Sequence, residues 1–319
     1  MEENKKFLID NKKIWVAGGN GMVGKSIINL LKQRNCKLIV SDRKDLDLTD
    51  QGMVTKWMSK NKPDLIFLAA AKVGGIHANK SFPVNFLEEN LLININIIKN
   101  AFINGTEKLV NLGSSCIYPK NIMHSIKEDK ILSGPLEKTN QWYSLAKISG
   151  IKLCQAYRRQ FNCDFISIMP SNLYGPGDNF NLLNSHVPAA LIDRFHTAKT
   201  NNLEKVEVWG SGKPLREFLY VEDLADACIF LAENYSSEEP INVGTGKEIS
   251  IKDFAELIKN IVDFKGKIVF DKTKPDGVYK KVLNIQKINK LGWNPKTSLE
   301  LGLTKYYKWY LDNISNIRR

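Results

Sequence analysis

The sequence predicts an α/β fold in which a doubly wound parallel sheet is joined to a smaller α/β lobe. Short apolar runs alternate with longer stretches of helical periodicity in the first half. The runs lie at Ile14–Ala17, Leu38–Val40, Leu65–Ala69, Leu109–Leu112 and Phe165–Met169, and the helical stretches include Val23–Leu31 and Phe86–Ala101. Strands without polar alternation are buried on both faces, which is typical of parallel sheets covered by helices.

After Pro170 the pattern becomes more irregular. A turn-rich stretch at Asn172–Pro176 leaves the last regular strand, and segments 187–200, 220–234 and 250–263 have helical periodicity. No repeat or low-complexity linker separates the halves, so we expect two tightly packed lobes. One comprises residues 1–173 with about 218–246, and the other about 174–217 with 247–319.

Composition restricts the class of protein. The 319 residues are 43% hydrophobic, which is enough for a large core. No apolar run could cross a bilayer and the N-terminus is charged, so we expect a cytoplasmic protein without membrane contact. Five cysteines without CxxC spacing argue against disulfides or a metal site. The net charge of +12 is dispersed, which favours a polyphosphate substrate over nucleic acid.

A glycine loop follows the first strand. Gly18, Gly21 and Gly24 lie three apart and lead into a helix, although the spacing differs from GxGxxG. Missing side chains let a pyrophosphate approach the backbone, and the helix N-terminus supplies N–H donors. This predicts a Rossmann-type site for NAD or NADP. Asp42 after the next strand favours NAD, whereas Arg43 favours NADP, so the pair leaves the choice open.

Three residues suggest hydride-transfer chemistry. Tyr143 and Lys147 lie four apart in the helical segment Gln141–Phe161 and therefore share a helix face. A free tyrosine has a pKa of about 10, and we expect the lysine ammonium to bring this pKa toward neutrality. Ser114 follows the strand Leu109–Leu112, at the sheet edge where ligands bind, and could hydrogen-bond a substrate carbonyl.

With these residues in place, the chain resembles the extended short-chain dehydrogenase/reductases, and within them the GDP-L-fucose synthase family. The resemblance spans nearly the whole chain, and the pairing of SSCIYP with NSHVPA is specific to that family. It is carried by AAAKVGGI at 69–76, LGSSCIYP at 112–119, YSLAK at 143–147, MPSNLYGPGDNF at 169–180, NSHVPAALIDRFH at 184–196, VWGSGKPLREFLYVEDLA at 208–225 and KPDG at 274–277.

The resemblance implies a reaction. The family uses NADPH to convert GDP-4-keto-6-deoxy-mannose to GDP-L-fucose, with epimerisation at carbons 3 and 5 before reduction at carbon 4. Matching motifs make Cys116 and His186 the acid and base of epimerisation. Tyr143 would protonate the carbon-4 oxygen, supported by Lys147 and Ser114. Thiol and imidazole titrate near neutrality, which suits the first role.

The resemblance also implies binding residues and a homodimer in which two helices per subunit form a four-helix interface. The residues implied to bind the GDP-sugar are Asn172, Arg194, Trp209, Arg216 and Asp276. For the cofactor they are Gly18, Asn20, Gly21, Met22, Val23, Gly24, Asp42, Arg43, Ala69, Ala70, Leu112, Gly113, Lys147, Pro170, Asn172 and Leu173.

Two departures from the family pattern and four alternative functions remain. Asn20 stands where some members carry an arginine for the 2′-phosphate, which keeps NAD open, and Trp142 beside the tyrosine also differs. The same machinery would suit a reductase of another GDP-4-keto-sugar, such as a heptose. A 4,6-dehydratase would need Asp-Glu where Ser115 and Cys116 stand. A 4-epimerase would leave Cys116 and His186 unexplained, and a non-catalytic dinucleotide scaffold would not need the hydride-transfer residues.

Overall fold

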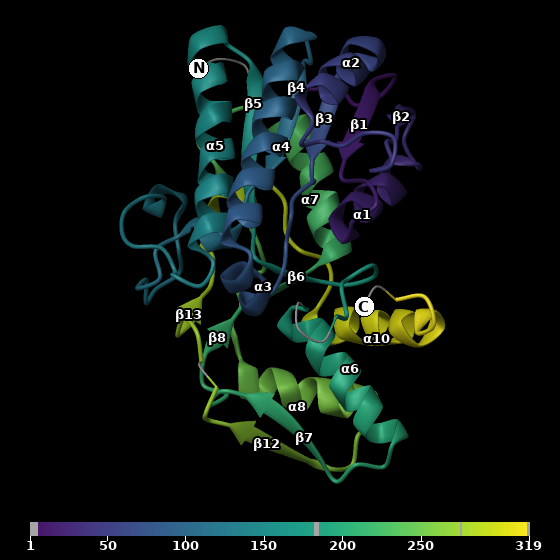
Figure 1. Ribbon diagram of the computed structural model, residues 1–319, viewed down its shortest axis with the longest axis vertical. Helices are drawn as coiled ribbons and strands as arrows, with labels where there is room; N and C mark the ends of the chain where they lie inside the picture. Colours follow the sequence, from purple (N-terminus) through teal and green to yellow (C-terminus); the bar gives the residue numbers. More distant parts are fainter. Residues whose placement is uncertain (1–5, 182–184, 275, 318–319) are drawn as a thin grey trace.

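The computed structural model describes residues 6–181, 185–274 and 276–317. Figure 1 shows an elongated molecule with a helix-covered sheet at one end and a smaller lobe at the other. The described residues form a six-stranded parallel sheet in the order β10-β5-β4-β3-β1-β2. Its strands are β1 (Lys13–Ala17), β2 (Lys37–Ile39), β3 (Leu65–Leu68), β4 (Lys108–Leu112), β5 (Asp164–Pro170) and β10 (Ile241–Val243). The predicted fold class is confirmed.

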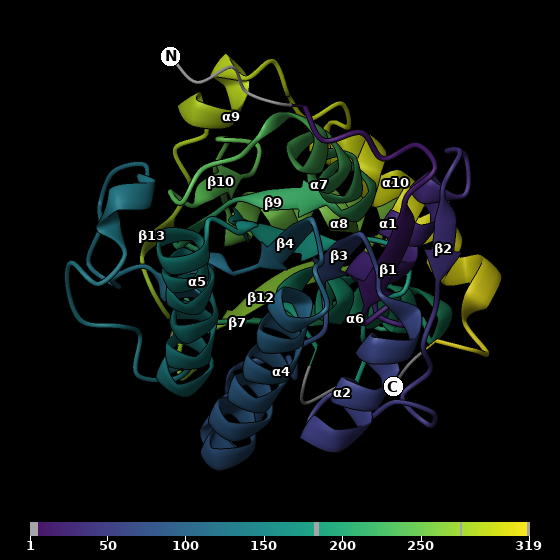
Figure 2. The same cartoon turned by 90° about the horizontal axis from the view of Figure 1, so that it is seen from above.

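Both faces of the sheet are buried because its strands are apolar on both sides. Ile14 and Val16 of β1 join a core with α1 and α7, whereas Trp15 and Ala17 join a core with α2, α4 and α5. Figure 2 shows these two helix groups on opposite sides of the sheet. The helices of this domain are α1 (Met22–Leu31), α2 (Gln51–Asn61), α3 (Ile76–Ser81), α4 (Pro83–Ile103), α5 (Gln141–Phe161), α7 (Val221–Asn234) and α9 (Gln286–Lys290), with 3₁₀ turns η1 (Ser115–Ile117) and η2 (Glu128–Lys130).

The smaller lobe has its own core, built by α6 (Val187–Thr200), α8 (Ile251–Val262) and α10 (Leu299–Asn313). Two parallel strands, β7 (Lys205–Trp209) and β12 (Lys267–Asp271), lie at its far end. A second small sheet has the order β11-β8-β13, with β8 (Leu215–Arg216), β11 (Ile249–Ser250) and β13 (Lys280–Lys281). The helices predicted at 187–200, 220–234 and 250–263 are confirmed within one residue.

Two segments differ from expectation. Asn172–Pro176 was expected to be a turn, but Asn172–Tyr174 forms β6, which pairs with β9 (Phe218–Tyr220). Segment 247–319 was assigned to the second lobe, yet Ile288 and Trp293 pack into the core of the sheet domain. Both differences arise from partners distant in sequence, which local periodicity does not reveal.

Glu217 connects three distant segments at the junction of the lobes. Its side chain is 0% exposed and accepts hydrogen bonds from the N–H groups of Thr245 (2.5 Å), Gly246 (2.8 Å) and Leu283 (2.7 Å). Burial raises the pKa of this carboxyl, and the three N–H donors oppose the shift. One carboxylate therefore positions the start of β9, the loop after β10 and the chain after β13.

Replacing Glu217 with alanine should destabilise the fold, because three backbone N–H groups lose their acceptor and that of Leu283 is buried. We expect the free energy of unfolding to fall by about 2 kcal/mol or more. Chemical denaturation followed by circular dichroism measures this. The exposed Glu204 provides the matched control, and Glu204→Ala should change the free energy by less than about 0.5 kcal/mol. Equal stability of the two variants would contradict the role of Glu217.

Candidate active site

The glycine loop packs tightly where β1 and β3 end side by side. Gly18 has a φ of +88°, and the Gly21 N–H donates to its carbonyl at 3.0 Å. A Cβ on Gly18 would lie 2.6 Å from the Ala70 nitrogen, and one on Gly24 would collide with the Gly18 carbonyl oxygen. Gly21 caps α1 without a side chain, so the first N–H groups of the helix stay available. This donor set fits a dinucleotide pyrophosphate.

The two selectivity candidates after β2 carry opposite charges. Asp42 and Arg43 are both exposed, and the Asp42 carboxylate also accepts from the Lys44 N–H at 3.1 Å, within its own turn. Asn20 in the glycine loop is exposed as well. Both selectivity candidates are therefore accessible to a cofactor.

Tyr143 and Lys147 lie on α5, whose bounds match the predicted segment, and both face the end of β4. The Lys147 Nζ donates to the Leu112 carbonyl at 2.7 Å and lies 5.9 Å from the centroid of the Tyr143 ring. Burial lowers the pKa of Lys147 to about 8. Two contacts fix α5 here: Ser144 Oγ donates to the Cys116 carbonyl (2.9 Å), and Asn94 Nδ2 of α4 donates to the Ala146 carbonyl (3.0 Å).

The pKa of Tyr143 differs from expectation. The sequence predicts that Lys147 brings it toward neutrality, but burial raises it, the charge of Cys116 raises it further, and a hydrogen bond with Ser114 only partly opposes the shift. The expected direction is therefore wrong, because desolvation of the phenolate outweighs the distant ammonium. Tyr143 keeps its proton at neutral pH, which suits a proton donor.

Cys116 lies in η1, next to these residues. Ser114 caps η1, and its Oγ accepts from the Cys116 N–H at 3.2 Å. The Lys281 Nζ donates to the Cys116 Sγ at 3.2 Å. Burial by itself would raise the pKa of the thiol, but the charge of Lys281, hydrogen bonds from Ser114 and Lys281, and the charge of Arg216 together lower it. The structure thus brings Ser114, Cys116, Tyr143 and Lys147 into one group.

His186 comes from the other lobe. It is the exposed N-cap residue of α6, and its side chain does not cap the helix. Asn184, from the same NSHVP motif, lies outside the described residues. The place of His186 as partner of Cys116 therefore stays a prediction.

A second group of predicted residues gathers in the smaller lobe. The Arg194 guanidinium lies 5.1 Å from the centroid of the Trp209 ring. Asp276 accepts from Ser211 through both carboxylate oxygens, at 2.6 Å from the backbone N–H and 2.8 Å from the hydroxyl. Arg216 is half-buried on β8 next to Gly277. These side chains form a polar surface with an exposed aromatic ring, suited to a nucleotide.

Sequence reasoning missed five residues near these groups. Lys274 lies over Trp209 at 5.6 Å, and Ser211 and Lys281 make the contacts given above. Asn140 and Ser171 each have a buried side-chain oxygen without a hydrogen-bond partner among the described residues. Ser171 lies between Pro170 and Asn172, both of which are predicted to bind the cofactor. Its hydroxyl is therefore suited to a hydrogen bond with a polar group of a bound cofactor. Motif matching indicated Lys274 only through KPDG, and nothing in the sequence indicated that Lys281 contacts Cys116.

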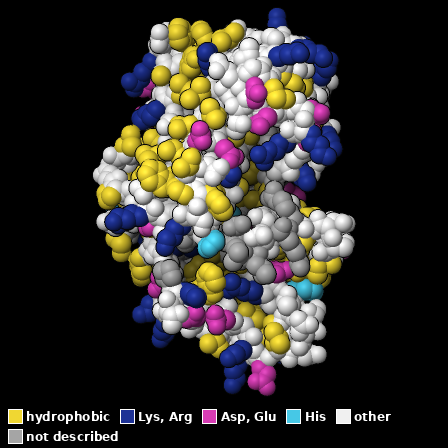
Figure 3. Space-filling view, in the orientation of Figure 1, with side chains coloured by type: hydrophobic (Ala, Val, Ile, Leu, Met, Phe, Trp, Pro, Cys, Tyr) yellow, Lys and Arg dark blue, Asp and Glu magenta, His cyan; other side chains and the backbone are white. Residues whose placement is uncertain are grey.

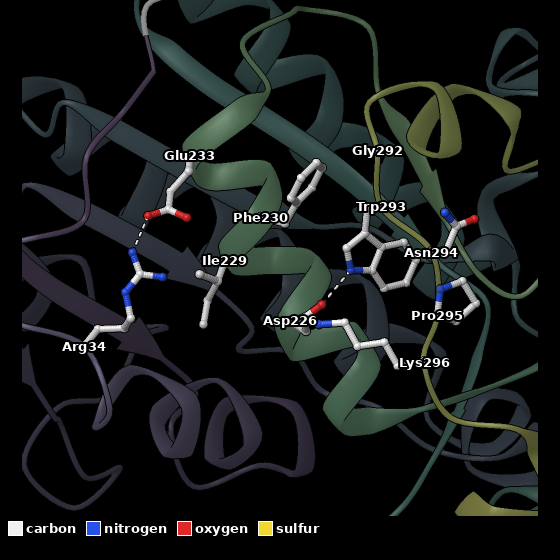
Figure 4. Close-up of a pocket in the computed structure, with 10 residues that line it drawn as sticks. All are labelled: Arg34, Asp226, Ile229, Phe230, Glu233, Gly292, Trp293, Asn294, Pro295 and Lys296. Carbon is white, nitrogen blue, oxygen red and sulfur yellow. Dashed lines mark hydrogen bonds and ion pairs between the residues drawn. The ribbon is translucent and has the colours of Figure 1, made fainter.

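The structure has two cavities of note, of which one lies between the lobes and the other lies away from the Tyr143 group. One of about 420 Å³ lies where Lys120, Asn121 and Glu137 face Gly277 and Tyr279, between the lobes. Another of about 510 Å³ lies between α7 and the loop Gly292–Lys296. Figure 4 shows that its charged groups pair with one another: Arg34 with Glu233, and Asp226 with Trp293 and Lys296. It lies apart from the Tyr143 group and has no unpaired charge to attract a ligand.

The described residues contain no cluster of side chains that could hold a metal ion. No helix among them is long and apolar enough to span a membrane. Fold and site together define a nicotinamide-dependent enzyme of the extended short-chain dehydrogenase/reductase class.

Comparison with known proteins narrows the class. Residues 14–244 match the model of the NAD dependent epimerase/dehydratase family. A GDP-L-fucose synthase of Sinorhizobium fredii is 52% identical over 310 residues, 97% of this chain and 99% of the relative. A GDP-L-fucose synthetase of Naegleria fowleri bound to NADP is 33% identical, covers 99% of both chains and has a TM-score of 0.92. A GDP-6-OMe-4-keto-L-xylo-heptose reductase of C. jejuni is 34% identical, with a TM-score of 0.91 over 96% of this chain and 99% of that one.

The chain therefore belongs to the NAD dependent epimerase/dehydratase family, and within it to the GDP-L-fucose synthase family. The resemblance inferred from sequence motifs is confirmed.

Proposed function

We propose that the protein is an NADPH-dependent epimerase/reductase that converts GDP-4-keto-6-deoxy-mannose to GDP-L-fucose. The observation that carries this proposal is the grouping of Ser114, Cys116, Tyr143 and Lys147 at the carboxyl end of β4. A reductase alone needs only the serine, tyrosine and lysine. The thiol with a lowered pKa adds a group able to move protons at carbons next to the ketone.

NADPH is the cofactor supported best. Bound NADPH would supply the hydride for the carbon-4 ketone. The glycine loop would hold its pyrophosphate, and Arg43, exposed after β2, would pair with a 2′-phosphate. The solved relative from Naegleria fowleri binds NADP.

For the reductive step, Tyr143 would donate its phenolic proton to the carbon-4 oxygen as negative charge develops there. The raised pKa of Tyr143 ensures that the proton is present at neutral pH. Ser114 would hydrogen-bond the same oxygen, and Lys147, held by the Leu112 carbonyl, would place its positive charge beside the phenolate that forms.

For epimerisation, Cys116 would act as the base. Its thiolate accepts the proton from carbon 3 or carbon 5, the C–H electron pair moves into an enolate, and the negative charge rests on the carbon-4 oxygen near Ser114 and Tyr143. His186 would return a proton to the opposite face of the same carbon. The GDP group would rest on the smaller lobe, with Arg216 and Arg194 near the diphosphate, Trp209 against a flat ring and Asp276 toward the guanine edge.

The Tyr143→Phe variant should lose most of the reduction, because the proton donor to the carbon-4 oxygen is missing. We expect oxidation of NADPH with the GDP-keto-sugar to slow about 10²–10⁴-fold. Calorimetric titration with GDP should still give an affinity close to that of the wild type. A variant with near-normal turnover would contradict the role of Tyr143.

Epimerisation can be tested separately by NMR analysis of the product formed in deuterated water. The wild-type enzyme should incorporate deuterium at carbons 3 and 5. Cys116→Ser should slow that incorporation by about 10²-fold or more, because a hydroxyl is a far weaker acid than a thiol and yields little base at neutral pH. Product of altered stereochemistry should then accumulate. Reduction by the wild type without deuterium at either carbon would indicate a reductase only, such as one acting on a GDP-4-keto-heptose.

We also propose that two copies of the chain associate through α4 and α5. The described surface of these helices exposes apolar side chains, and Figure 3 shows hydrophobic side chains gathered over this part of the molecule. They include Leu92, Ile95, Phe102, Trp142, Leu145 and Phe161. Pairing this face with its copy would remove the side chains from water.

Sedimentation should therefore give a dimer for the wild type. The double variant Ile95→Glu, Leu145→Glu should sediment as a monomer, because burying two carboxylates from each copy in an apolar interface is unfavourable. Leu203→Glu, at an exposed apolar position of the smaller lobe, provides the control and should remain dimeric. A monomeric wild type, or a dimeric double variant, would contradict the interface.

A further inference from the structure

Lys281 contacts Cys116, and hydride transfer does not require this contact. It comes from β13 in the smaller lobe, and its Nζ donates to the Sγ of Cys116 in η1 at 3.2 Å. The contact joins the two lobes across 165 positions of sequence. No residue of the Ser114, Tyr143 and Lys147 group needs it, because Lys147 is already held by the Leu112 carbonyl.

The position of Lys281 is fixed by the backbone on both sides. Lys281 pairs with Arg216 in the parallel ladder of β13 and β8. The following residues are buried and tied: the Val282 carbonyl accepts from the Ile126 N–H at 2.8 Å, and the Leu283 N–H donates to Glu217 at 2.7 Å. Lys281 is therefore directed at Cys116 by the fold.

The surroundings of the thiol favour its charged form. Two cations on neighbouring strands, Lys281 and Arg216, act on Cys116 from the smaller lobe, and both lower the pKa of the thiol. The group that faces it from α5 is Tyr143, which is protonated and neutral at working pH. An unperturbed thiol, with a pKa of about 8.5, would be mostly protonated at neutral pH and a poor base.

We propose that Lys281 is a positioning residue that holds Cys116 as a thiolate, so that Cys116 can take protons from the carbons beside the ketone. This role rests on the proposed epimerisation and deepens it. In the step itself the sulfur gains the proton, the C–H electron pair becomes the enolate, and the ammonium of Lys281 remains charged throughout. Because the lysine and the thiol belong to different lobes, the base is complete only when the lobes are packed together.

The test measures the thiolate directly and does not depend on the reaction. The rate of alkylation of Cys116 by iodoacetamide is followed from pH 5 to pH 10 by mass spectrometry of the Cys116 peptide. Removing the cation in Lys281→Met should move the midpoint of this profile to higher pH and slow alkylation at pH 7 about tenfold or more. Lys281→Arg, which keeps a cation, should restore most of the rate.

The neighbouring residue supplies a matched control. Lys280 precedes Lys281 on the same strand, but its Nζ pairs with Glu248 at 2.6 Å. Lys280→Met removes the same charge from the chain and should leave the midpoint unchanged. An unchanged midpoint in Lys281→Met, or equal shifts in the two methionine variants, would overturn the proposal. Circular dichroism and thermal melting check that each variant is folded, and Lys281→Gln, which also removes the charge, takes the place of Lys281→Met if that variant does not fold.

Deuterium exchange separates this proposal from the proposed function. If the wild type exchanges at carbons 3 and 5, Lys281→Met should slow the exchange at pH 7 and recover rate as the pH rises, whereas NADPH oxidation with an already epimerised substrate changes little. A shifted alkylation midpoint in an enzyme that never exchanges deuterium would retain the Lys281–Cys116 pair and reject the epimerase. Exchange that is equally fast in Lys281→Met and wild type would reject the role of Lys281 while leaving the epimerase intact.

Discussion

The buried carboxylate of Glu217 is the interaction on which the arrangement of the site depends. It accepts N–H groups from the loop after β10 and from the chain after β13, while its own backbone joins β8 to β9. On one side it therefore fixes Arg216, its neighbour in sequence. On the other it fixes Lys281, two residues before Leu283. Together with the hydrogen bond from the Ile126 N–H to the Val282 carbonyl, this carboxylate attaches the small sheet β11-β8-β13 to the domain that carries Cys116.

The same attachment explains how one site can serve two kinds of chemistry. The sheet domain contributes the tyrosine, lysine and serine, and desolvation by that domain keeps Tyr143 protonated and lowers the pKa of Lys147 to about 8. The smaller lobe contributes cations that act on Cys116 in the opposite sense and lower the pKa of the thiol. A proton donor and a candidate base thus lie side by side because their environments push their pKa values apart.

The conformation of the glycine loop at the cofactor end of the site is set by steric contacts and not by charge. A side chain at Gly18 would meet Ala70, and one at Gly24 would collide with the carbonyl of Gly18. The loop therefore packs against the end of β3 while α1 directs its uncapped N–H groups outward. These constraints follow from the absence of Cβ atoms, and they explain why the glycine spacing serves despite its departure from GxGxxG.

The sequence by itself determined five of the six strands of the sheet, several of the long helices and the membership of the family, because these depend on local periodicity and on contiguous motifs such as SSCIYP and YSLAK. It also placed Tyr143 and Lys147 on one helix, since residues four apart share a face. Only the tertiary structure decided the direction of the pKa shift of Tyr143, the strand at Asn172–Tyr174, the packing of Ile288 and Trp293 on the first domain, and the contact of Lys281 with Cys116. Each of these depends on burial or on a partner far away in the chain, and desolvation and long-range pairing leave no mark in local sequence.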